Sequence, residues 1–252
     1  MKIAVFIKQT PQVASVQVAD KAIWPEADLI INPFDEYAIE EALRIKEKIG
    51  CRTAAITYGK ATAESSLRDA LALGIEEAYH IVDEQFDYLN PQQAAMVLSK
   101  AVLKIGDIDM VLTGKQATDD DSALVAPAVA AFLDWPQVGF IRKFESVEQK
   151  MVICQRTSDM GFDRIEVKLP AIFSVVKEIN EPRLPSLKGK MQAKKASINK
   201  MSLSDLGVTP EIRMVVKGIS PIPPRTAGEI LEGDTDVVID TLVSKLKEHQ
   251  LL

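Results

Sequence analysis

The chain alternates between continuous apolar runs and segments whose apolar residues recur every three or four positions. The continuous runs are typical of strands buried on both faces of a sheet, and they occupy residues 2–7, 53–57, 78–82 and 109–113. The periodic segments between them are predicted helices. Two of these helices start at Asn-Pro pairs, Asn32 and Asn90, and end at Gly50 and Gly106. This order predicts an α/β fold with a doubly wound, mostly parallel, Rossmann-like sheet through about residue 135.

Beyond residue 135 the pattern changes to short strand-like runs with no obvious helix between them. These runs predict antiparallel additions to the sheet, and they occupy residues 138–144, 151–156, 165–169 and 172–176. We therefore expect an α/β domain with added strands at residues 1–180, a basic, proline-broken loop at 181–200, and a C-terminal arm at 201–252. The arm is predicted to end in a helix over residues 236–249, where apolar residues recur at i, i+4 steps.

Composition narrows the classes of function. The 252 residues carry 30 basic and 36 acidic side chains, a net charge of −6, which gives no electrostatic reason to expect a nucleic-acid partner. No apolar run is long enough to cross a bilayer and no signal peptide is recognised, so we expect a cytoplasmic protein without membrane insertion. Cys51 and Cys154 lack metal-type spacing, and the only histidines are His80 and His249. We therefore expect neither a metal site nor catalytic residues.

Residues 111–125 form the most informative stretch of the chain. A short predicted strand ends at Gly114, three consecutive acids follow at residues 119–121, and a helix is predicted from Ala123. A strand that passes through a glycine turn into a helix leaves backbone N–H groups without partners. Such groups suit a phosphate, and the dipole of the helix favours its negative charge. We therefore place a phosphate against the backbone of residues 121–125.

The three acids of this stretch need a different role, because a carboxylate beside a phosphate is repelled. Ser122 or Asp121 is predicted to cap the helix. Asp119 or Asp120 would accept hydrogen bonds from a ribose. The alternative is that the acids only complement the positive end of the helix dipole.

Four segments are expected to meet at one edge of the predicted sheet. In doubly wound sheets, ligands bind beyond the carboxyl ends of the strands. Residues 6–8, 58–59 and 113–115 follow three of the predicted strands, and residues 32–35 join them if the long loop at residues 9–26 doubles back. Neither of the common glycine-rich phosphate motifs is present. The convergence of the four segments nevertheless predicts a nucleotide crevice.

Residues 181–200 contain two prolines and six lysines or arginines. The prolines restrict the chain without giving it a regular element, and Gly189 leaves it free to adjust. The composition is that of a solvated loop, but Leu184 and Leu187 favour a docking surface instead, because a solvated loop has no reason of its own to expose a leucine. Lys188 and Lys190 would steer a partner of opposite charge toward them.

Taken in order, the motifs of the chain resemble those of the electron transfer flavoprotein β-subunit family. The resemblance covers essentially the whole chain and rests on residues 32–34, 114–121, 132–137, 168–171, 180–183, 193–195, 205–207 and 224–228. It implies a heterodimer whose α subunit holds most of a redox FAD, while the β subunit buries a structural AMP and packs its C-terminal arm on the α subunit. It further implies docking of acyl-CoA dehydrogenases and related flavoenzymes, and electron delivery to a downstream quinone oxidoreductase or other acceptor.

The family's functional residues can be carried over position by position. Its cofactor contacts fall on Phe6, Asn32, Pro33, Phe34, Asp35, Tyr58, Gly114, Lys115, Gln116, Ala117, Thr118, Asp119, Asp120, Asp121, Ser122, Ala123, Leu124 and Val125. Phe34 matches a residue that reaches toward the FAD ring. Leu187 matches the leucine that anchors the docking loop, Leu184 is the rival anchor, and Lys188 and Lys190 lie beside them.

Departures from the family pattern leave alternatives. AMP-binding members often read Asn-Gln-Thr where this chain reads Ala123-Leu124-Val125, so backbone N–H groups and Ser122 would hold the phosphate. Electron-bifurcating members bind a second FAD in this crevice and resemble Asn-Pro-Asp-Asp and Asp-Gly-Asp-Thr where this chain reads residues 32–35 and 119–122. Here Phe34 narrows the entrance and Asp120 has a side chain in place of the glycine, so we favour AMP. An ATP-using enzyme of the related adenine nucleotide α-hydrolase architecture would need a glycine-rich loop after the first strand, which is absent. A free-standing nucleotide sensor would not need the basic loop or the arm.

Overall fold

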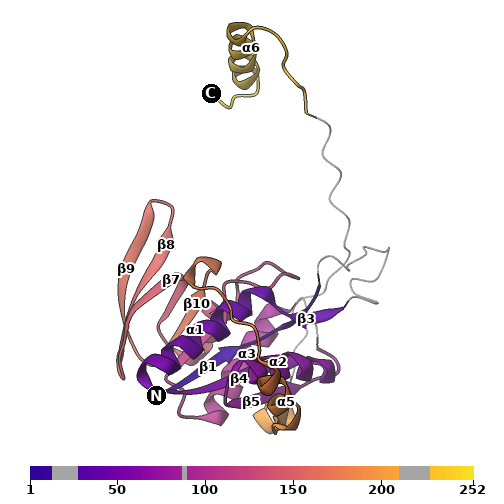
Figure 1. Ribbon diagram of the computed structural model, residues 1–252, viewed down its shortest axis with the longest axis vertical. Coiled ribbons are helices and arrows are strands. Elements are labelled where there is room, and N and C mark those ends of the chain that lie inside the picture. Colours follow the sequence, from indigo (N-terminus) through magenta and orange to yellow (C-terminus); the bar gives the residue numbers. More distant parts are fainter. Residues whose placement is uncertain (13–27, 87–89, 210–227) are drawn as a thin grey trace. The chain divides into compact units, whose positions relative to one another are not determined.

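The computed structural model describes residues 1–12, 28–86, 90–209 and 228–252. The chain forms two compact units, residues 1–218 and residues 219–252. The first unit contains a nine-stranded sheet of order β11-β5-β4-β1-β6-β10-β7-β8-β9 and a two-stranded sheet of β2 and β3 (Figure 1). The strands are β1 (Lys2–Phe6), β2 (Gln9–Pro11), β3 (Leu29–Ile31), β4 (Arg52–Gly59), β5 (Glu77–Val82), β6 (Met110–Gly114), β7 (Gln137–Val147), β8 (Met151–Ser158), β9 (Gly161–Lys168), β10 (Ala171–Val175) and β11 (Asn199–Ser202). The helices are α1 (Pro33–Ile49), α2 (Glu64–Leu73), α3 (Pro91–Ile105), α4 (Val125–Leu133), α5 (Leu187–Lys195) and α6 (Thr235–Glu248), with short 3-10 turns at Ala61–Ala63, Lys177–Ile179 and Ser204–Leu206.

The centre of the large sheet is parallel and buried on both faces. Strand β1 lies between β4 and β6, and its Ile3 pairs with Thr53 on one side and Met110 on the other. All five residues of β1 and of β6 are buried, as a strand covered on both faces requires. Residues of α1 and α2 form one core cluster against the sheet, and residues of α3 and α4 form the other. The predicted doubly wound fold is confirmed.

The predicted boundaries of the two helices that follow Asn-Pro pairs, α1 and α3, also hold. Gly50 and Gly74 follow α1 and α2 with φ of 72° and 121°, values that only glycine adopts without strain. Asn90 caps α3, because its side chain accepts a hydrogen bond from the backbone N–H of Gln93 at 3.1 Å. Helix α1 likewise begins with proline in its first turn, after Asn32.

The prediction of antiparallel additions is right for three strands and wrong for the fourth. Strand β8 pairs antiparallel with both β7 and β9. Strand β10 instead inserts between β6 and β7 and pairs parallel with both of them. Its five residues, Ala-Ile-Phe-Ser-Val, are all buried, which is typical of a central parallel strand rather than of an added edge.

Three connections differ from what the sequence suggests. The long first loop includes the strand pair β2–β3, and the rest of it, residues 13–27, lies outside the described residues. The segment at 181–200 is not an irregular loop, because α5 occupies Leu187–Lys195. Strand β11 crosses the predicted boundary between this loop and the arm, pairs with β5 and completes the large sheet. The second unit contains α6, which confirms the predicted terminal helix.

Candidate functional site

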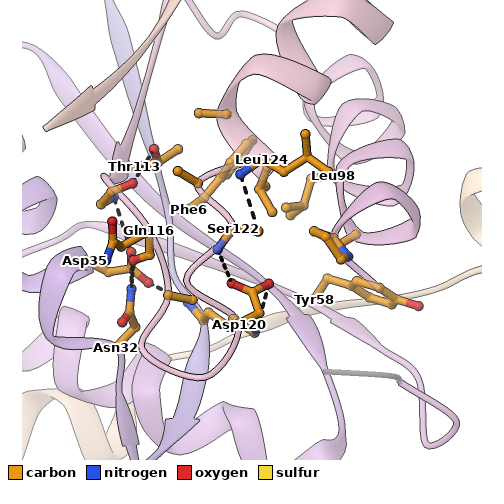
Figure 2. A pocket seen from close by; sticks show the side chains of 18 of the residues that line it. Phe6, Asn32, Asp35, Tyr58, Leu98, Thr113, Gln116, Asp120, Ser122 and Leu124 are labelled. Carbon is orange, nitrogen blue, oxygen red and sulfur yellow. Dashed lines mark hydrogen bonds and ion pairs between the residues drawn. The ribbon is translucent and has the colours of Figure 1, made fainter. Parts of the chain in front are cut away.

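A pocket lies at the carboxyl ends of β1, β4 and β6, between the start of α4 and the first turns of α3 (Figure 2). Its polar side holds Asn32, Asp35 and Gln116, and its apolar side holds Tyr58 and Leu98 (Figure 2). The structure thus brings together the four segments that were expected to meet at this edge of the sheet. The predicted site residues that line the pocket are Phe6, Asn32, Asp35, Tyr58, Gly114, Gln116, Ala117, Asp120, Ser122, Ala123, Leu124 and Val125.

Six predicted site residues do not line the pocket: Pro33, Phe34, Lys115, Thr118, Asp119 and Asp121. Three further lining residues, Ile7, Lys8 and Thr113, belong to the strand-end segments expected at this edge. Six lining residues were missed: Phe86, Asn90, Pro91, Ala94, Leu98 and Ala126. Four of the missed residues belong to α3 or to its cap. A signal for them existed, because the helix that follows β5 starts at the same edge of the sheet as the other strand ends.

Asp35 ties three of the converging segments together. Its carboxylate accepts hydrogen bonds from the backbone N–H of Lys8 at 2.8 Å, from Asn32 Nδ2 at 2.9 Å and from the backbone N–H of Gly114 at 3.2 Å. Burial raises the pKa of Asp35 to about 7, although these hydrogen bonds oppose the rise. Gly114 has to be glycine, since an added Cβ would lie 2.6 Å from the backbone carbon of Phe34.

Asn32 extends this network to the acid turn. Its Nδ2 also donates to the carbonyl of Gln116 at 2.9 Å, and its Oδ1 accepts from the backbone N–H of Thr118 at 3.2 Å. Asn32 occupies the N-cap position of α1 but makes no capping hydrogen bond with its side chain. The predicted start of the helix at Asn32 is therefore right, but the buried side chain holds the loop after β6 instead of capping the helix.

The three acids of the turn have different surroundings. Asp119 has a buried side chain that lies 2.7 Å from Lys8 Nζ, and burial raises its pKa in spite of that ion pair. Asp120 lines the pocket, 3.7 Å from Lys8 Nζ, and accepts a hydrogen bond from the backbone N–H of Ser122 at 3.2 Å. Asp121 contacts Gln116 and is exposed. Of the two carboxylates predicted to face a ribose, only Asp120 faces the pocket.

Helix α4 begins later than predicted. Asp121 and Ala123 both have φ of 52°, so the chain makes two left-handed steps before it becomes helical at Val125. The N-cap residue is Leu124, and the prediction of Ser122 or Asp121 as cap is wrong. Ser122 Oγ instead accepts a long hydrogen bond, 3.4 Å, from the backbone N–H of Leu124 within the turn.

The apolar side of the pocket is held rigid by Tyr58 and its neighbours. The Tyr58 hydroxyl donates to Asp83 Oδ2 at 2.6 Å and accepts from Gln93 Nε2 at 2.9 Å. The rings of Tyr58 and Phe86 pack edge to face with centroids 4.8 Å apart. This side can accept a flat, largely apolar ring system, whereas the opposite side offers hydrogen-bonding groups.

The predicted docking residues lie on and just before α5. Leu184 is 91% exposed and Leu187 is 77% exposed, so neither side chain packs back on the sheet. Met191, one turn after Leu187, is 60% exposed. A shallow hollow on this helix is lined by Leu187, Lys188, Met191, Gln192 and Lys195. Lys190 is exposed beside it.

Within the described ranges, no group of three or more His, Cys, Asp or Glu side chains could hold a metal ion. His80 is fully buried in β5, with Nε2 3.1 Å from the carbonyl of Lys60, and burial lowers its pKa. None of the helices that the structure describes is long and apolar enough to span a bilayer.

Comparison with known proteins gives a consistent family. The electron transfer flavoprotein domain model matches residues 23–206. The chain is 38% identical to the electron transfer flavoprotein subunit beta of Thermoanaerobacterium thermosaccharolyticum, over 100% of both chains. It is 34% identical, also over 100% of both chains, to subunit CarD of the caffeyl-CoA reductase-Etf complex of Acetobacterium woodii. It is 38% identical to the bovine electron transfer flavoprotein subunit beta, over 86% of this chain and 84% of the bovine one. The chain therefore belongs to the electron transfer flavoprotein family, among its β subunits.

Proposed function

We propose that the chain is the β subunit of a heterodimeric electron transfer flavoprotein. In this role it accepts electrons, together with an α subunit, from acyl-CoA dehydrogenase-type flavoenzymes and passes them to a quinone oxidoreductase or another acceptor. FAD supplies the redox chemistry and is held mostly by the α subunit. The chain itself is a carrier subunit rather than an enzyme. The observation that carries the proposal is the pocket at the strand ends, in a chain that is similar over its full length to an electron transfer flavoprotein subunit beta.

The residues of the pocket fit an adenine nucleotide. The backbone N–H groups of Val125 and Ala126 open α4 and have no preceding helical carbonyl to bond, and both residues line the pocket. A phosphate at this point would benefit from these donors and from the helix dipole. The rings of Tyr58 and Phe86 suit a base, and Asp120 suits a ribose hydroxyl. Bound in this way, the nucleotide stabilises the fold in proportion to its concentration and affinity.

AMP fits this pocket better than a second FAD. Asp120 turns its carboxylate into the pocket beside Lys8 at the turn where bifurcating members have glycine. A glycine there would let a pyrophosphate approach the backbone, whereas the Asp120 side chain fills that space. The full-length similarity to a subunit of the caffeyl-CoA reductase-Etf complex favours the second candidate, a bifurcating β subunit with FAD in the same pocket.

The nucleotide released on denaturation distinguishes the two candidates. The chain is co-expressed with its α subunit, the complex is purified and denatured, and the nucleotides are quantified by chromatography. One FAD and one AMP per heterodimer is the expected result. Two FAD and no AMP would establish the bifurcating type, and a complex without any nucleotide beyond one FAD would leave the pocket without its proposed ligand.

The exposed face of α5 is the proposed docking surface for the donor flavoenzyme. Leu187 and Met191 offer apolar anchors, and the neighbouring lysines attract a partner surface that carries carboxylates. Burying one leucine in a partner pocket contributes about 1.5–3 kcal/mol. Leu187→Ala should therefore reduce the rate of flavin reduction at low dehydrogenase concentration by roughly ten- to a hundredfold, without changing the FAD or AMP content.

A further inference from the structure

The segment that leads from β10 to α5 is fastened to α1 at two places. Asn180 Nδ2 donates to the carbonyl of Tyr37 and to Glu41 Oε2, each at 3.0 Å, and Arg183 makes the attachment that lies next to the exposed leucines. Arg183 donates from Nε to Glu40 Oε2 at 2.7 Å, from Nη2 to Glu40 Oε1 at 3.1 Å, and from Nη1 to Glu47 Oε1 at 2.5 Å. Its backbone N–H also donates to Glu40 Oε2 at 3.2 Å. This forked arrangement fixes both the position and the orientation of the guanidinium. A lysine at position 183 could not reproduce it, because its ammonium is a single point of contact.

The partner of Arg183 is a buried carboxylate rather than a mobile surface acid. Glu40 is 4% exposed and also receives a hydrogen bond from Arg44 Nε at 2.8 Å. Burial alone would raise the pKa of Glu40, but the hydrogen bonds from Arg183 and Arg44 hold it below its ordinary value. A partly buried, forked pair of this kind restrains its segment far more than an exposed ion pair does.

The other end of the segment is fastened to α2. Ser186 caps α5 by accepting a hydrogen bond from the backbone N–H of Gly189 at 3.0 Å. Arg68 of α2 donates to the carbonyls of Ala193 at 2.7 Å and Lys194 at 3.3 Å, which satisfies the last turn of α5. The segment is thus held at its start by α1 and along its helix by α2 (Figure 1).

Between these two attachments the chain exposes three apolar side chains, those of Leu184, Leu187 and Met191. Leu184 follows Arg183 directly, and Leu187 and Met191 come three and seven positions after Leu184. Apolar anchors on a restrained support bind a partner without first losing the conformational freedom of a loop. The apparent affinity of an anchor that is correctly placed only part of the time falls by that fraction. Arg183 therefore controls the availability of the anchors although it need not touch the partner.

We infer that Arg183 is a positioning residue for docking. Through its hydrogen bonds to Glu40 and Glu47 it holds Leu184 and Leu187 in the arrangement that a donor flavoenzyme binds. This inference rests on the proposed docking role of α5. It identifies the matching partner surface as an apolar pocket bordered by carboxylates, preformed to receive a fixed helix rather than a flexible loop.

The test uses the α–β complex and a medium-chain acyl-CoA dehydrogenase supplied with octanoyl-CoA. Flavin reduction is followed over a range of complex concentrations for wild type, Arg183→Lys and Glu47→Gln. Arg183→Lys should raise KM for the complex about tenfold, equivalent to ~1.4 kcal/mol, and leave kcat within about twofold. Glu47→Gln removes an exposed half of the fork without leaving a buried charge unpaired, and it should raise KM by roughly two- to fivefold. FAD content and reduction by dithionite should be unchanged in both variants.

Two further variants make the outcomes separable. Arg164→Ala removes an arginine that lies 2.7 Å from Glu145 on the antiparallel strands, so it should leave both KM and kcat unchanged. Leu187→Ala should raise KM if α5 docks the dehydrogenase. A raised KM in Leu187→Ala with a wild-type KM in Arg183→Lys and Glu47→Gln would overturn the positioning role alone. If Leu187→Ala also has a wild-type KM, the docking role of α5 is overturned. If Arg183→Lys and Glu47→Gln lower kcat at a constant KM, the positioning role is overturned.

Discussion

Gly189→Ala tests whether α5 is seated on α2 as closely as the structure shows. A Cβ added at Gly189 would lie 2.2 Å from the carbonyl oxygen of Ala72 and 3.3 Å from its carbonyl carbon. Ordinary carbon–oxygen contacts are about 3.3 Å or longer, so the two backbones would have to separate by about 1 Å. The substitution therefore has two opposing effects on stability. The clash with Ala72 destabilises the protein, whereas alanine is intrinsically the better helix former and stabilises α5.

The sizes of these two effects decide whether Gly189→Ala raises or lowers the free energy of unfolding. Replacing glycine by alanine inside a helix favours the folded state by at most about 1 kcal/mol. Overpacking against backbone costs about 1–3 kcal/mol, and moving α5 would also weaken the hydrogen bond from Arg68 to Ala193, a charged donor worth about 1.5–3 kcal/mol. We expect a net loss of about 1–3 kcal/mol in the free energy of unfolding.

The assay is equilibrium denaturation in urea, comparing midpoints at an unchanged m-value. Gly139→Ala is the matched control, because its added Cβ would lie 3.4 Å from Ser174 Oγ and meets no backbone atom. The midpoint should fall for Gly189→Ala and change little for Gly139→Ala. A midpoint that rises in Gly189→Ala, as helix propensity alone predicts, would refute the close seating of α5.

Three further substitutions address the site. Burial raises the pKa of Asp35 from 3.8 to about 7, so its contribution to stability is fully present below about pH 4 and is lost as the pH rises through 7. Three pH units correspond to on the order of 4 kcal/mol in the free energy of unfolding. Asp35→Asn should remove this pH dependence from unfolding curves measured at a series of pH values. Asn90→Ala should lower the free energy of unfolding by about 1 kcal/mol, since it removes the cap of α3. Ser122→Ala should change it by less than about 0.5 kcal/mol, because Ser122 does not cap α4; calorimetry showing equal losses for these two variants would contradict the assigned caps.

The parallel half of the fold follows directly from the sequence pattern. Each strand there is a continuous apolar run, each helix has its own start and stop residues, and the rule that ligands bind beyond the strand ends places the pocket. The sequence could not show that β10 enters the centre of the sheet, because a run of five buried residues reads the same at the centre as beside an added hairpin. The order of strands in a sheet is set by contacts between distant parts of the chain, and the local sequence pattern does not report it.

Long-range contacts also explain the errors within the site. Asn32 and Ser122 have the residue types of helix caps, and local preference alone assigns them that role. The structure uses Asn32 to hold residues 116 and 118, far along the sequence, and two left-handed residues postpone the start of α4. The prolines that precede α5 and the glycine within it suggest a loop, but Gly189 is required by the proximity of Ala72 rather than by flexibility.

Strand β10 follows β7, β8 and β9 in the sequence, and this order affects how the protein folds during synthesis and where it can be truncated. Strands β7, β8 and β9 join the large sheet only through β10, which is made after all three of them. A chain that stops before residue 171 leaves β6 with an unpaired edge and a three-stranded ribbon with no attachment to the sheet. During synthesis the nucleotide pocket can therefore assemble before the sheet is continuous. A truncated protein that ends after α4 needs substitutions that keep the unpaired edge of β6 from pairing with another chain, for example charged residues along that edge.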